Sequence, residues 1–147
     1  MMFLMFMAFL AGIALATQAT LITHLGQISS SSLIATFVAF LSSSIIMSFV
    51  VLTYVKKLPS IEVIKSVPIY LWFTGGLLSA FALALFYYLI PKIGILPLVS
   101  LSLGGQLIFA VIAGHYGLFN FPVTTIDTSK IIGVASMLLA IFLINKG

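Results

Sequence analysis

The sequence predicts an all-α membrane protein whose single domain, residues 1–147, crosses the bilayer five times. Of its residues 63% are apolar and only 5% are charged, whereas about a quarter of a soluble domain is charged. Mean hydropathy is +1.36. The apolar residues form five runs, each near the roughly 20 residues that a membrane-spanning helix needs. These runs are 2–23, 32–55, 69–90, 94–114 and 129–145.

The first run also has features of a signal peptide, because small residues at Ala14 and Ala16 follow its apolar stretch. It lacks the positive charge that precedes the apolar part of a signal peptide. Four further apolar runs follow it, so we interpret it as the first membrane helix.

The boundaries of the other runs carry cap and turn residues. The serines at 29–32 are expected to cap the second helix. Pro68 precedes the third helix, where a missing N–H costs least. Residues 91–94, Pro-Lys-Ile-Gly, are expected to form a tight turn into the fourth helix.

The charges lie at the ends of the apolar runs. Net charge is +4, from six lysines against Glu62 and Asp127. Lysines in such places reach the lipid headgroups, so we read them as bilayer contacts and expect no nucleic-acid partner. Five spans place the two ends of the chain on opposite sides, with four lysines on one side and two on the other. That difference favours an inside N-terminus only weakly, so both orientations remain compatible with insertion. The two sets are Lys56, Lys57, Lys65 and Lys130, and Lys92 and Lys146.

The composition argues against an enzyme. There are no cysteines, two histidines and two acidic residues, too few to build a catalytic triad or a metal site, and we expect no cofactor. Both acids lie in loops, which disfavours coupling through a buried carboxylate and favours neutral or anionic solutes. His115 lies at a helix end, where it fits either an interfacial histidine or a proton relay, because histidine changes charge near neutral pH.

Uncharged polar residues inside the runs provide the candidate site. An amide without a partner is costly in hydrocarbon, so Gln18 and Gln106 should face protein or a water-filled cavity. Small and hydroxylated residues lie on the same helix faces as these two glutamines. This pattern fits either helix packing alone or helix packing around a cavity. We predict that the two glutamines bind substrate, with Ser102, Ser43 and Thr36 lining the site.

Aromatic and glycine residues complete these predictions. Trp72 is a candidate cavity wall, although together with Tyr70, Tyr87 and Tyr88 it also fits the aromatic belts found at membrane interfaces. Four glycines are predicted to allow close packing and bending of the helices rather than to contact substrate. They are Gly75, Gly76, Gly104 and Gly105.

The run LWFTGGLLSAFALALFYYLIPKIGILPLVSLSLGGQLIFAVIAGHYGLF resembles the YdcZ-like family of inner-membrane exporters. This family belongs to the drug/metabolite transporter superfamily and is related to small multidrug resistance transporters. The resemblance covers nearly the whole chain, including Gln18 and residues 130–133. The chain departs from the family pattern at Ile22, Ser43 and Gly114, where an asparagine, a glycine and an acid are common.

The resemblance implies an architecture and a function. A five-helix chain is similar to one half of a ten-helix transporter with two inverted halves, so the implied assembly is an antiparallel homodimer with dual topology. The implied function is export of a small solute by alternating access across the bacterial inner membrane. A passive pore and a non-transporting membrane assembly subunit remain as alternatives.

Overall fold

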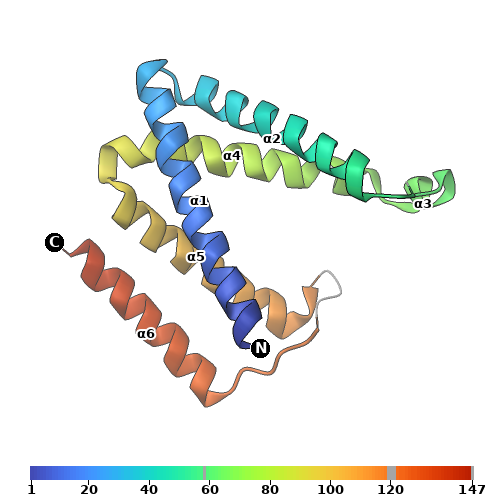
Figure 1. Cartoon of the computed structure of the whole chain (residues 1–147). Helices are drawn as coiled ribbons and strands as arrows, with labels where there is room; N and C mark the ends of the chain where they lie inside the picture. The colour runs from blue at the N-terminus through green and yellow to red at the C-terminus, as the bar shows by residue number, and fades with distance from the viewer. Residues whose placement is uncertain (58, 119–121, 147) are drawn as a thin grey trace. The chain divides into compact units, whose positions relative to one another are not determined.

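A computed structural model describes residues 1–57, 59–118 and 122–146 of the chain (Figure 1). Phe119, the last residue of the segment that resembles the YdcZ-like family, and Asn120 lie outside these residues. The described residues form six helices, five of which are long and apolar enough to cross a membrane, as predicted. The chain divides into two compact units, Met1–Lys92 and Ile93–Gly147. The helices are α1 (Met2–Ile28), α2 (Ser32–Tyr54), α3 (Ile61–Ser66), α4 (Ile69–Ile93), α5 (Ile95–Tyr116) and α6 (Thr128–Asn145).

In the first unit, α1 and α2 are joined by a tight turn. α1 continues to Ile28, five residues beyond the predicted run, and the chain turns at Ser30, whose φ is 54°. Ser31 caps α2, its side chain accepting a hydrogen bond from the Ile34 N–H at 3.3 Å. The two helices contact each other near this turn and diverge away from it (Figure 1). Their buried contact is therefore confined to the ends of α1 and α2 that adjoin the turn.

The rest of the first unit differs from the sequence prediction in two places. The polar connection after α2 contains the short helix α3, capped by Ser60. Pro91 lies inside the last turn of α4, where we predicted a tight turn. A proline near a helix end disrupts little of the hydrogen-bond ladder, and the helix ends only before Gly94, whose φ of 85° suits glycine.

In the second unit, α5 and α6 lie side by side and run antiparallel (Figure 1). Gly104 is buried at their contact, where a Cβ atom would lie 3.0 Å from Ile141 Cδ1. One helical turn from this contact, the Asn145 side-chain amide donates to the buried Ser100 hydroxyl at 3.0 Å. It also donates to the carbonyl of Ile141 at 2.7 Å. The close contact at Gly104 and the hydrogen bond between Asn145 and Ser100 thus hold the two helices together.

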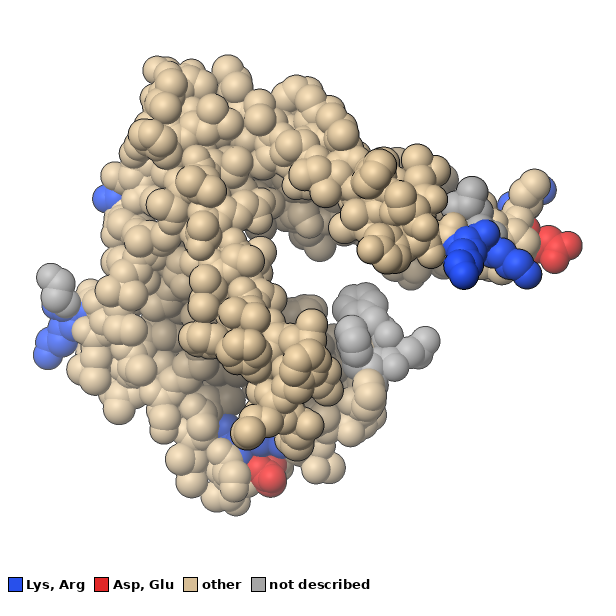
Figure 2. Space-filling model, viewed as in Figure 1, with Lys and Arg blue, Asp and Glu red and all other residues tan. Residues whose placement is uncertain are grey.

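Most side chains of the spanning helices are exposed in this single chain. The fraction of residues buried in the most apolar window of each span lies between 0% for α4 and 17% for α2 and α5. The charged side chains gather at helix ends and in connections (Figure 2). The uncharged surfaces between them suit contact with lipid tails or with other membrane helices.

Gly104→Val is expected to weaken the α5–α6 pair. The larger side chain cannot fit against Ile141 without movement, so the free energy of unfolding should fall by about 1–3 kcal/mol. Gly105→Val is the matched control, because a Cβ at Gly105 meets no described atom within 4 Å. Circular dichroism during denaturation of dilute protein in detergent measures the free energy of unfolding of both variants. Equal losses for the two variants would contradict the assigned contact.

Candidate functional site

The first unit places Gln18 beside a buried tyrosine. Gln18 is half-buried on α1, and its side chain lies within interaction range of the Tyr87 hydroxyl of α4. The contact does not have the geometry of a normal hydrogen bond. Tyr87 is 2% exposed and packs with Ala19 and Ala39, at the point where α1, α2 and α4 meet. The amide predicted to bind substrate therefore lies at the edge of the small core of this unit.

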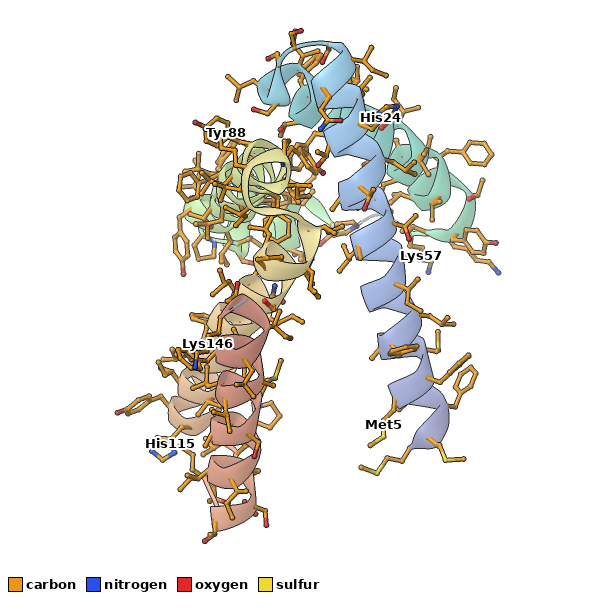
Figure 3. The ribbon with its side chains drawn as sticks, turned by 90° about the vertical axis from the view of Figure 1, so that its left-hand side faces the viewer. Met5, His24, Lys57, Tyr88, His115 and Lys146 are labelled. Carbon is orange, nitrogen blue, oxygen red and sulfur yellow. The ribbon has the colours of Figure 1, made fainter. Side chains whose placement is uncertain are left out.

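Tyr87 differs from its predicted role in an aromatic belt. Its ring is in the core of the unit, whereas its neighbour Tyr88 is 50% exposed (Figure 3). Consecutive residues of a helix point about 100° apart, so only one member of the pair faces α1 and α2. The sequence did not distinguish these two tyrosines.

The two hydroxylated residues predicted on α2 lie in different surroundings. Thr36 is 7% exposed, close to the turn, and its hydroxyl donates to the carbonyl of Ser32 at 2.7 Å. Ser43 lies farther along α2 and is exposed. In the single chain, Thr36 therefore packs, while Ser43 is accessible on an open face.

The predicted residues of α4 also lie on open surfaces. Trp72 is 54% exposed. A Cβ atom added at Gly75 or Gly76 would meet no described atom within 4 Å. Gly75 and Gly76 therefore have no packing partner among the described residues of their own unit.

On α5, neighbouring residues face different ways. Gly104 is buried against α6, whereas Gly105 and Gln106 are exposed. Ser102 is half-buried, and its hydroxyl donates to the carbonyl of Val99 at 2.9 Å. The Gln106 side chain thus lies exposed near the middle of a membrane-length helix. The Ser102 hydroxyl, in contrast, already has a hydrogen-bond acceptor in its own helix.

A groove that the sequence did not indicate lies in the second unit. It has a volume of about 790 Å³ and runs between α5, α6 and the segment before α6. Its lining is mostly apolar and includes Leu107, Ala110 and Leu138, with Thr124 and Lys130 as polar members. Lys130 Nζ donates to the carbonyl of Thr125 at 2.5 Å. The groove suits an apolar occupant and does not include Gln106.

The end of α5 shows why an acid is poorly accommodated at position 114. The Thr124 N–H donates to the carbonyl of Gly114 at 2.8 Å. A Cβ atom at Gly114 would lie 2.7 Å from Thr124 Oγ1, which is too close without movement. His115, labelled in Figure 3, is exposed. The centroids of its ring and the Tyr116 ring lie 5.1 Å apart in an edge-to-face arrangement. The proton-relay role of His115 stays a prediction.

The described residues contain no group of three or more His, Cys, Asp or Glu side chains that could hold a metal ion. Sequence reasoning missed the pairing of Ser100 with Asn145 and the burial of Thr23 and Tyr87. Only the spacing of Thr23, four residues before Gln27 on the same helix, indicated that these two polar residues share a face.

A family model described as "Putative inner membrane exporter, YdcZ" matches residues 3–143, from α1 into α6. No curated protein and no solved structure matches the chain.

Proposed function

Because the chain belongs to the YdcZ family of inner-membrane exporters, we propose that it exports a small neutral or anionic solute by alternating access. The family and the five apolar helices make the chain a multi-pass protein of the inner membrane. In the proposal, two copies insert in opposite orientations, and the solute binds between them near the bilayer midplane.

The observation that carries the proposal is the exposure of polar and small residues at mid-membrane positions. Gln106 lies eleven residues from the start of α5 and is exposed. An amide left in hydrocarbon costs several kcal/mol, roughly 4–8 on a cyclohexane scale. A second copy that packs on the open face of α5 would enclose this amide and could approach closely at the exposed Gly105.

Gln18 supplies the second polar group of the proposed site. Its half-buried side chain is held near the Tyr87 hydroxyl but is not fixed by a normal hydrogen bond. The amide therefore retains donor and acceptor capacity for a solute. Amides and hydroxyls without a carboxylate suit a neutral or anionic solute better than a cation, and no catalytic step is part of the proposal.

A solute-binding screen on purified protein, repeated on Gln106→Ala, tests the site. A compound that binds between the copies is expected to bind the variant roughly tenfold more weakly, because one hydrogen-bonding group is lost. Ser48→Ala is the control, since Ser48 is exposed and its hydroxyl already donates to the carbonyl of Ser44 at 2.8 Å.

Three results would contradict the proposal. Equal binding to wild type and Gln106→Ala would remove Gln106 from the site. In proteoliposomes, a gradient-driven flux that does not saturate would indicate a passive pore instead. No flux, together with stable co-purification of another membrane protein, would indicate an assembly subunit.

A further inference from the structure

A second polar pocket lies in the first unit, at the end of the α1–α2 pair. It has a volume of about 450 Å³ and is formed by the last turn of α1, the turn at 29–31, the start of α2 and the end of α4. Since three helix ends meet there, the pocket lies at one surface of the membrane. Its polar lining residues include Thr23, Gln27, Ser31, Ser32, Tyr87 and Lys92.

Two buried hydroxyls in this pocket lack hydrogen-bond partners among the described residues. They belong to Thr23, which is 4% exposed, and Tyr87, which is 2% exposed. Such a group costs about 1–3 kcal/mol when it stays unsatisfied. Thr17, Thr20 and Thr36 avoid this cost by donating to the carbonyl four residues earlier in their own helices. Thr23 does not, so its hydroxyl remains available to a molecule in the pocket.

The charge around the pocket is positive. Lys92 contributes an ammonium group, which donates to the Tyr88 hydroxyl and lies 3.8 Å from the centroid of the Tyr88 ring. The pocket also includes the first turn of α2, where the N–H groups of Ser32 and Leu33 have no acceptor within the helix. The positive end of the helix dipole adds to this field. None of the described residues that line the pocket is acidic.

We propose that this pocket binds a phosphoryl group. A phosphoryl group carries negative charge and several strong acceptor oxygens, so it can accept hydrogen bonds from both hydroxyls, the ammonium group and the α2 amides together. The group can belong to the headgroup of an anionic phospholipid, because the pocket lies at headgroup level, or to a soluble phosphate compound. This pocket adjoins Gln18 of the proposed transport site at Tyr87, but its occupancy can be measured without solute export.

The experiment compares two ligands on protein purified in a sugar-based detergent. Inorganic phosphate is titrated by isothermal calorimetry, and phosphatidylglycerol retention is measured by native mass spectrometry against a glycosyl diacylglycerol that lacks phosphate. The test variant is Thr23→Val with Tyr87→Phe, which removes both hydroxyls with little change in shape. The matched control is Thr20→Val with Tyr70→Phe, because Thr20 and Tyr70 are exposed members of the same two helices.

Wild type and control are expected to bind one of the phosphate ligands at least about tenfold more tightly than the test variant does. Lys92→Met should weaken the same ligand. Preference for phosphatidylglycerol over the glycolipid identifies a lipid headgroup, whereas binding of inorganic phosphate alone identifies a soluble ligand. Helical content measured by circular dichroism confirms that each variant is folded. Absence of binding to both ligands, or equal losses in test and control variants, would overturn the proposal.

Discussion

A cysteine introduced by Ser66→Cys is expected to react from both sides of the membrane in intact cells and inverted vesicles. The chain has no native cysteine, so the label reports one position. Ser66 is exposed at the end of α3, and its replacement leaves the balance of four lysines against two unchanged. A difference this small should allow a substantial fraction of chains, roughly a third to a half, in each orientation. Membrane-impermeant maleimide, applied to each preparation, measures the two fractions.

Lys146→Cys should shift this distribution. The change removes one of the two lysines on the less basic side, so more chains should insert with α3 inside. Lys57→Cys removes a lysine from the other side and should bring the two fractions closer to equality. If each variant were labelled from a single side only, with position 146 on the side opposite to positions 57 and 66, the antiparallel dimer would be removed from the proposed function.

Gln18→Leu is expected to reduce transport in proteoliposomes by roughly 10- to 100-fold for a compound that wild type moves. A solute that leaves water must exchange its hydrogen bonds for protein groups, and loss of one buried partner costs about 1–3 kcal/mol. The leucine keeps the volume of the side chain next to Tyr87, so folding should be preserved. Initial rates over a range of solute concentrations measure the loss of transport. Circular dichroism on the same samples measures whether the variant is folded.

Thr17→Val is the control for this loss. Thr17 adjoins Gln18 on α1, is exposed, and already donates to the carbonyl of Ile13 at 2.9 Å. Its replacement should leave transport within about twofold, because no hydrogen bond to a solute is removed. If Gln18→Leu transports as well as Thr17→Val, Gln18 does not bind the solute.

The number and nature of the membrane-spanning helices could be predicted from the sequence because they depend on local properties. Long uncharged runs must form helices in a bilayer, where each backbone polar group needs an internal partner. The cap at Ser31 likewise follows from a serine just before an apolar run. α3 and the extension of α1 to Ile28 were missed, because neither carries a strong local signal.

The sequence by itself determined the class of protein, the five spans, the polar residues inside them and the resemblance to an exporter family. Only the tertiary structure decided that Gly104 packs and Gly105 does not, that Tyr87 is buried and Tyr88 exposed, and that Thr23 lacks the bond that Thr36 makes. Neighbouring residues on a helix point about 100° apart, so their surroundings depend on which other helix approaches. That approach is set by contacts between residues far apart in the chain, and composition and spacing do not encode it locally.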